Sequence, residues 1–149
     1  MRLTLYTDLS LRLLMFLALR PDGLATIQDA AERYRVSRNH LMKVARQLGQ
    51  TGFIETVRGR GGGLRLSRPA EEIRIGDVVR TTEEGFRMVE CFDPDRNTCG
   101  LAPACRLKGV LGEALGAYLA ALDRYTLADL TARGPAMRQL LGLPEVEAA

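Results

Sequence analysis

Residues 36–66 read V-S-R-N-H-L-M-K-V-A-R-Q-L-G-Q-T-G-F-I-E-T-V-R-G-R-G-G-G-L-R-L, with helical spacing in the first half and strand-like spacing in the second. A helix is predicted from Arg38 to about Gln50, with Ser37 as its N-cap and Gly52 just past its end. Its inner face follows the i, i+3, i+4, i+7 spacing of an amphipathic helix through Leu41, Val44, Ala45 and Leu48.

Two short strands are predicted after this helix, at residues 53–57 and 64–66. The segment between them, residues 58–63, contains four glycines and is too glycine-rich for regular structure. Two short strands around a glycine tip are typical of a β-hairpin. The chain therefore changes from helix to hairpin within this one stretch.

Two further helices are expected upstream. The first covers residues 3–19 and ends at the turn residues 21–23. The second runs from Thr26 to about Arg33, with Thr26 as N-cap and Asp29 three residues later in capping-box position. After a short break at residues 34–36, the helix and hairpin described above follow. Helix, tight break, helix and hairpin is the order of a winged helix-turn-helix, so a mainly α fold with a small β-hairpin wing is expected.

The polar face of this unit predicts a DNA interface. With the apolar face turned inward, the start of the second helix of the pair presents Ser37, Arg38, Asn39, His40 and Lys43. Arg and Asn make bidentate contacts to guanine and adenine edges, and a Ser at a helix N-terminus suits a phosphate oxygen. Arg58 and Arg60 on the hairpin tip suit a minor groove. Thr26, which opens the preceding helix, completes the predicted set of DNA contacts.

The charge distribution agrees with a nucleic-acid partner. Net charge is only +3, but residues 1–68 hold 12 Lys and Arg against 5 Asp and Glu, whereas residues 69–149 hold 9 against 13. A basic half joined to an acidic half suggests that one end meets a polyanion. No stretch approaches the roughly 18 uncharged apolar residues that a membrane span needs, and charges interrupt the N-terminal apolar runs. A soluble, cytoplasmic protein is expected, with no membrane partner.

The second half of the chain has fewer elements. A short helix is expected at about residues 73–83 and a loop at 84–103. Residues 104–125 give the strongest helical pattern, with apolar side chains at alternating spacings of three and four. Because one small winged domain cannot cover this stripe, the helix is expected to pair with its twin in a homodimer. The predicted regions are the winged domain 1–83, the loop 84–103, the dimerisation helix 104–130 and the C-terminal tail 131–149.

All three cysteines lie in or beside that loop, as Cys91, Cys99 and Cys105 with the spacing C-x7-C-x5-C. An odd number argues against a disulfide framework, and the lack of C-x2-C pairs argues against a structural zinc site. Thiolates on a flexible loop suit an iron–sulfur cluster. The fourth ligand must then come from elsewhere in this chain, from a partner chain or from a small molecule. Such an open position suits a sensor of small reactive species.

With these motifs in hand, the sequence resembles the Rrf family of iron–sulfur winged-helix transcription regulators, and within it the nitric-oxide-sensitive repressors. The resemblance covers about residues 1–130. It is carried by L-Y-T-D-L-S-L-R at 5–12, V-S-R-N-H-L-M-K-V at 36–44, V-R-G-R-G-G-G-L-R-L at 57–66, I-R-I-G-D-V-V-R at 73–80 and P-A-C-R-L-K at 103–108.

This resemblance implies a dimeric repressor that binds a palindromic operator in its cluster-loaded form and releases it when nitric oxide attacks the cluster. It also implies that Asp8, reaching over from the other protomer, completes a [4Fe–4S] site with the three cysteines. The interpretation from the residues alone is that the Asp8 carboxylate interacts favourably with the helix dipole at the helix terminus, or forms an ion pair with Arg12.

Alternatives remain open at this point. A related branch of the family uses a His three residues after the third Cys, where this chain has Lys108, which cannot ligate as an ammonium. The long first interval between cysteines keeps [2Fe–2S] as the alternative cluster. A regulator of the same fold that senses cluster supply, iron or redox state is the second candidate function. A zinc-structured DNA-binding protein is another, while one His and no catalytic constellation argue against an enzyme.

Overall fold

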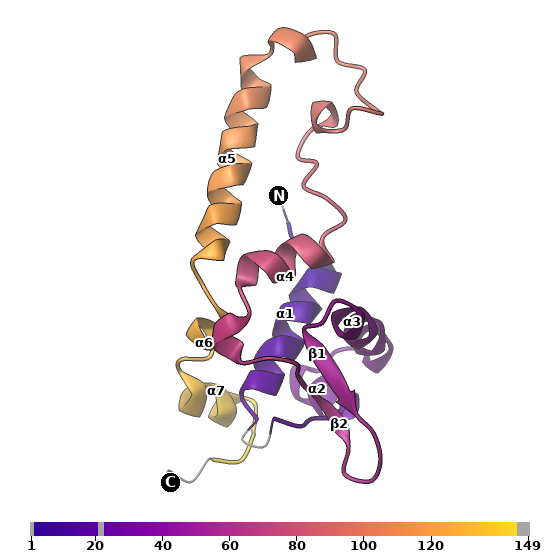
Figure 1. Ribbon diagram of the computed structural model, residues 1–149, viewed down its shortest axis with the longest axis vertical. Coiled ribbons are helices and arrows are strands. Elements are labelled where there is room, and N and C mark those ends of the chain that lie inside the picture. The colour runs from indigo at the N-terminus through magenta and orange to yellow at the C-terminus, as the bar shows by residue number, and fades with distance from the viewer. Residues whose placement is uncertain (1, 21–22, 146–149) are drawn as a thin grey trace.

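The computed structural model describes residues 2–20 and 23–145. The predicted turn residues Pro21 and Asp22, and residues 146–149 of the predicted tail, lie outside this description. Figure 1 shows a body of short helices with a hairpin at one side and one long helix projecting from it. The elements in chain order are α1 (Leu5–Ala18), α2 (Ile27–Tyr34), α3 (Arg38–Gln50), β1 (Ile54–Val57), β2 (Gly63–Leu66), η1 (Ala70–Glu72), α4 (Ile75–Thr82), η2 (Glu90–Phe92), η3 (Ala102–Ala104), α5 (Arg106–Asp123), α6 (Leu127–Leu130) and α7 (Gly134–Leu140).

The helix pair α2–α3 forms where its caps predict it. The Thr26 hydroxyl accepts from the Asp29 N–H at 3.0 Å and the Asp29 carboxylate accepts from the Thr26 N–H at 3.1 Å, which is the predicted capping box. Helix α2 ends at Arg35, which adopts the left-handed conformation with φ of 53° and turns the chain sharply. The Ser37 hydroxyl then caps α3. The predicted break between the two helices is thus confirmed.

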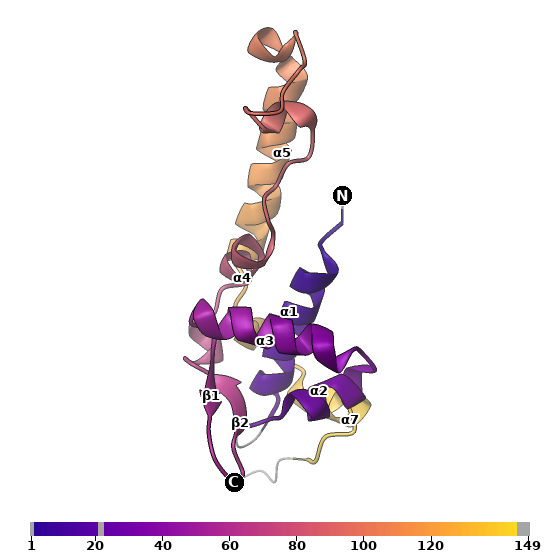
Figure 2. The same cartoon turned by 90° about the vertical axis from the view of Figure 1, so that its right-hand side faces the viewer.

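The predicted hairpin is also confirmed. Strands β1 and β2 pair antiparallel, with Ile54 opposite Leu66 and Val57 opposite Gly63. A Cβ on Gly62 would lie 2.1 Å from the Val57 carbonyl oxygen, so this turn admits no larger residue there. Leu64 also bridges to Ala25, which ties the hairpin to the segment before α2. The hairpin is therefore fixed to the body at its base, and its tip extends away from α5 (Figures 1 and 2).

One hydrophobic core holds the winged domain together. Helix α1 crosses its centre and packs on α3, α4, α6 and β2. Its Leu13, Leu14, Phe16 and Leu17 are almost fully buried, and the Phe16 ring meets the Tyr34 ring edge-on at 5.9 Å between centroids. Burial of this kind stabilises by about 1.5–3 kcal/mol per large side chain. The aliphatic core is the reason that a chain with so few aromatic residues folds as packed helices.

Helix α5 stands out from this body, and Figures 1 and 2 show it projecting beyond the other elements, with residues 84–105 running from the end of α4 to its far end. None of its 18 residues is buried within the chain. Helix α5 begins and ends within two residues of the helix predicted at 104–125. It stops short of residue 130, where the predicted dimerisation region ends.

The long helix ends early because the chain turns back to the body. The Tyr125 carbonyl accepts from the Ile75 N–H at 3.0 Å, and the Leu127 N–H donates to the Ile73 carbonyl at 2.8 Å. Leu127 is fully buried as a result, and a second capping box, Thr126 with Asp129, starts α6. Leu127–Leu130 thus belongs to the body and not to the projecting helix.

The segment after residue 130 is more ordered than a tail. Residues Gly134–Leu140 form α7, which begins with a proline in its first turn, as Pro135 can because its missing N–H is not needed there. Leu143 is buried in the core, with Met137 and Leu141 packed against it. This helix was not predicted because its seven residues are too few to form a long apolar stripe in the sequence. It is anchored to the core through a few side chains.

Candidate nucleic-acid interface and metal centre

The N-terminal turn of α3 presents a polar surface. Leu41, Val44, Ala45 and Leu48 are buried, and their burial turns the other side of the helix to solvent. The exposed set matches the predicted one: Ser37, Arg38, Asn39, His40 and Lys43. The Ser37 hydroxyl accepts from the His40 N–H at 3.4 Å. This surface can offer two cations, an amide and an imidazole to a nucleic acid.

The wing adds two more cations. Arg58 and Arg60 are exposed at the hairpin tip. The neighbouring Gly59 and Gly61 adopt positive φ values of 100° and 75°, a backbone conformation that favours glycine. Because glycines carry no side chain, they leave both guanidinium groups unobstructed. The tip can therefore enter a narrow groove.

Thr26 has a structural task that is independent of any nucleic acid. Its exposed hydroxyl caps α2. The hydrogen bond that its backbone N–H donates to the Asp29 carboxylate is the main cause that lowers the pKa of Asp29 below its usual range. Thr26 therefore fixes the start of α2, whatever else it contacts.

Asp8 lies in the first turn of α1 and forms an ion pair with Arg12 one turn later. Oδ2 is 2.8 Å from Nη2 of Arg12, and Oδ1 accepts from its Nε at 3.0 Å. The Asp8 side chain is 43% exposed, so it is accessible from outside. The intrachain alternative for Asp8, an ion pair at i+4, is confirmed.

The three cysteines lie on the segment that leads into the start of α5. Cys91 lies in η2 and is half-buried, Cys99 is exposed, and half-buried Cys105 is the N-cap of α5. All three are free thiols. Across residues 2–20 and 23–145, no three His, Cys, Asp or Glu side chains are grouped closely enough to hold a metal ion. Asp8 lies on α1 and forms no such group with the cysteines, so the predicted ligand set is not brought together within the described part of one chain.

A chain of hydroxyl groups connects the start of α1 to the end of α4, which the sequence analysis did not anticipate. Thr82 Oγ1 donates to Thr7 Oγ1 at 2.9 Å in the core, and Thr4 donates to the Glu83 carboxylate through its N–H at 2.8 Å and its hydroxyl at 3.0 Å. Burial opposes the ionisation of Glu83, but the hydrogen bonds from Thr7 and Thr4 outweigh it and lower the pKa of Glu83. The only signal in the sequence was the Thr at each helix end.

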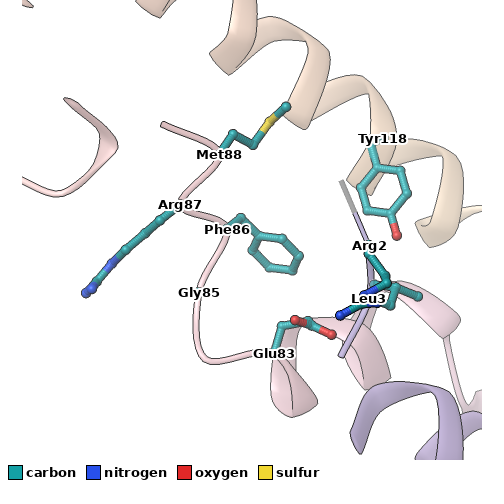
Figure 3. A pocket seen from close by; sticks show the side chains of 8 residues that line it. All are labelled: Arg2, Leu3, Glu83, Gly85, Phe86, Arg87, Met88 and Tyr118. Atoms are coloured by element: carbon teal, nitrogen blue, oxygen red, sulfur yellow. The ribbon is translucent and has the colours of Figure 1, made fainter. Parts of the chain in front are cut away.

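An open cavity of about 480 Å³ lies beside this network. Figure 3 shows Glu83 and Leu3 on one side and Tyr118 of α5 above them, with the Phe86 ring pointing inward and Arg87 pointing away. The cavity separates the N-terminal segment from α5 and the first residues of the cysteine loop. Its walls come from three parts of the chain: residues 2–3, residues between Glu83 and Met88, and Tyr118 of α5.

Comparison with known proteins shows which family has this sequence and fold. The family model described as Rrf2, iron-dependent transcriptional regulator, matches residues 3–133. The chain belongs to the Rrf2 family. The HTH-type transcriptional regulator NsrR of Bacillus subtilis strain 168 is 56% identical over 146 residues, which cover 97% of this chain and all of that protein. The regulator of the same name from Shouchella clausii is 53% identical and covers 99% of both chains.

A solved structure shares the fold. The T. potens IscR structure matches with a TM-score of 0.74 and 22% identity, covering 93% of this chain and 91% of that one. The expected winged-helix fold is thereby confirmed for this Rrf2 member. The matching family model and the curated relatives named above are transcriptional regulators, so the chain is a DNA-binding regulator of transcription. Among the helices that the structure describes, none has the length and apolar character to cross a membrane.

Proposed function

We propose that this chain is an iron–sulfur-dependent repressor that senses nitric oxide and releases its operator in response. The observation that carries the proposal is the placement of all three free thiols on one segment, residues 91–105, which leads into the start of α5. The identity of 56% to a regulator named NsrR, over the full length of that protein, supports the same branch of the family.

The donor set fits an iron–sulfur cluster in its chemistry. Cys91, Cys99 and Cys105 are accessible thiols without disulfide partners, and thiolates are the ligands that iron–sulfur clusters prefer. We propose these three residues and Asp8 of the partner subunit as the ligands, for a [4Fe–4S] cluster, with [2Fe–2S] as the alternative. When bound, the cluster supplies the centre that reacts with nitric oxide.

The exposed face of α5 supports a homodimer. Leu107 is 62% exposed and Val110 51% exposed, although both belong to the apolar side of the helix. A helix of 18 residues without one buried side chain needs a second apolar surface to cover it. A second copy of the chain supplies that surface through a two-fold axis. In such a dimer, two α3 helices meet successive major grooves about 34 Å apart.

Each of the eight predicted DNA contacts in the winged domain then has a role in binding the operator. Arg38 and Asn39 contact base edges, while Ser37, His40 and Lys43 contact the phosphate backbone or neighbouring bases. Arg58 and Arg60 enter the minor groove, and Thr26 contacts a phosphate beside the start of α2. We assign DNA reading to residues 1–83, the ligand loop to 84–103, and dimerisation to the helix that ends at Asp123.

Asp8 connects the ligand set to the winged domain. Its carboxylate is held by Arg12 on α1, and α1 packs directly on α3, which carries the proposed base contacts. A cluster ligand bond to Asp8 would fix α1 of one subunit relative to α5 of the other. Without that bond, the two α3 helices would no longer be held at a common spacing, and specific affinity would fall because both half-sites could not be bound together.

The test is made on protein purified without oxygen. Its DNA site is first selected from a random duplex pool, and binding to that duplex is then measured at fixed salt before and after nitric oxide is added. A coloured, iron- and sulfide-containing protein that loses its visible absorbance and its DNA affinity together is expected. If nitric oxide leaves DNA binding unchanged while iron depletion or an oxidant abolishes it, a sensor of cluster supply or redox state is indicated instead. Zinc in place of iron would contradict both.

A further inference from the structure

The stretch between Cys91 and Cys99 is folded on itself. Glu90, just before Cys91, accepts hydrogen bonds from both the N–H and the hydroxyl of Thr98, just before Cys99; the hydroxyl bond is 2.7 Å long. An extended chain of eight residues spans more than about 25 Å. The two bonds to Glu90 instead hold both ends of the stretch side by side.

A second carboxylate closes the interior of this stretch. Asp93 is only 6% exposed, in a segment that is mostly exposed. Its Oδ2 pairs with Arg87 at 2.9 Å, and its Oδ1 accepts from the Asp95 N–H at 3.2 Å. A buried carboxylate is costly unless it is paired and hydrogen-bonded, so these contacts define one compact arrangement.

The backbone of Cys99 is held as well. Its N–H donates to the Asn97 side-chain oxygen at 3.1 Å. Cys105 lies outside this unit, six residues further on at the start of α5. The loop therefore carries its ligands in two groups, with Cys91 and Cys99 in a self-bonded unit and Cys105 on the helix.

We propose that Glu90 is a positioning residue that holds Cys91 and Cys99 as a preformed pair before any cluster is bound. This inference rests on the proposed function, since it assigns these thiols to a cluster. Glu90 touches no ligand sulfur in this role and acts through Thr98. A preformed pair spares the chain the entropy of ordering this stretch when the cluster binds, so the bound cluster is retained longer.

Three variants isolate this role. Glu90→Ala removes the acceptor, whereas Glu90→Gln keeps an amide oxygen at the same reach that can still accept from Thr98. Glu84→Ala removes an exposed carboxylate of the same segment outside the Glu90–Thr98 contact, and serves as the matched control. All three leave the cysteines in place.

The first measurement needs no cluster. Amide hydrogen exchange is followed at Thr98 in the iron-free protein, and Glu90→Ala is expected to exchange about two- to tenfold faster than wild type, the range for one net hydrogen bond. Glu90→Gln is expected to recover most of the protection and Glu84→Ala to match wild type. Equal exchange in Glu90→Ala and wild type would overturn the proposal.

The second measurement uses the same proteins after reconstitution with ferrous iron and sulfide. The rate at which a chelator removes the visible absorbance is expected to rise about two- to tenfold in Glu90→Ala, and to return toward wild type in Glu90→Gln. Unchanged retention despite faster exchange would overturn the positioning role while leaving the cluster in place. A wild-type protein that takes up no cluster would instead overturn the proposed function and this role with it, whatever the exchange data show.

Discussion

Arg80 of α4 and Asp123 of α5 form a two-pronged ion pair at the base of the long helix. Nη1 of Arg80 lies 2.6 Å from Oδ1 of Asp123, and Nη2 lies 2.7 Å from Oδ2. Arg74 adds a bond from its Nη1 to the Asp123 carbonyl at 2.8 Å. This junction joins the winged domain to α5, so it sets the direction in which the long helix leaves the body.

Gly76 leaves room for this junction. A Cβ at this position would lie 1.8 Å from Oδ1 of Asp123 and 2.8 Å from Nη1 of Arg80. Any larger residue must therefore push the two charged groups apart. Because a Gly-to-Ala change inside a helix also gains up to about 1 kcal/mol in helix propensity, the unfolding midpoint at one pH cannot isolate the effect.

The pH dependence of unfolding isolates it. The hydrogen bonds from Arg80 lower the pKa of Asp123 in the folded protein. A carboxyl whose pKa is lower when folded contributes stability above its unfolded pKa of about 3.9, and loses it as the pH falls through the folded value. We expect the unfolding midpoints of wild type and Asp123→Asn to differ from neutral pH down to about pH 4, and this difference to shrink below pH 4. Gly76→Ala should follow Asp123→Asn; a Gly76→Ala profile parallel to wild type would show that the pair survives.

Two substitutions of Thr26 distinguish its role as the N-cap of α2 from its proposed contact with DNA. Thr26→Ala is expected to lower the free energy of unfolding by about 0.5–2 kcal/mol, because the Asp29 N–H loses its acceptor. Thr26→Asp keeps a good N-cap but places a negative charge at the proposed phosphate contact. Urea unfolding should therefore find Thr26→Asp near wild type, while titration of the selected duplex finds weaker binding. Wild-type DNA affinity in Thr26→Asp would remove Thr26 from the interface.

The proposed homodimer can be tested on the exposed face of α5. Leu107→Asp and Val110→Asp should each raise the dimer dissociation constant about tenfold or more, because burial of one such side chain contributes about 1.5–3 kcal/mol. Leu140→Asp is the matched control, since Leu140 of α7 is 87% exposed and lies outside this face. Sedimentation equilibrium measures all three. Equal dissociation constants in all three variants would place the dimer contact elsewhere.

The wing arginines should act through the phosphate backbone and the groove potential. Arg58→Ala and Arg60→Ala are each expected to reduce the salt dependence of DNA binding by about 0.9 in the slope of log affinity against log salt. Arg124→Ala, at the C-cap of α5, is the control. Fluorescence anisotropy at several salt concentrations gives the slopes. A slope unaltered by both wing substitutions would exclude the tip from the interface.

Local patterns were sufficient to predict the winged domain. The caps at Thr26 and Ser37, the apolar spacing of α3 and the glycine tip all act within a few residues, and each is found where it was expected. These signals are strong because capping and turn chemistry depend on neighbours in the sequence.

Contacts between distant segments could not be predicted in this way. Helix α5 ends at Asp123 because residues 125 and 127 bond to residues 73 and 75, and α7 is held by a few buried side chains. The Glu90–Thr98 bonds likewise join polar residues with no periodic pattern. The cysteines were identified by spacing alone, and the proposed fourth ligand, Asp8 of the partner subunit, involves no contact within one chain.

The most direct test of the central claim compares DNA binding by the protein with and without the proposed iron–sulfur cluster. Affinity for the selected duplex is measured for anaerobically purified protein, for protein stripped of iron by a chelator, and for a variant with Cys91, Cys99 and Cys105 all changed to Ser. The account predicts tight binding only for the first sample, with both others reduced to the level of random duplex. Equal affinity in all three samples would contradict it.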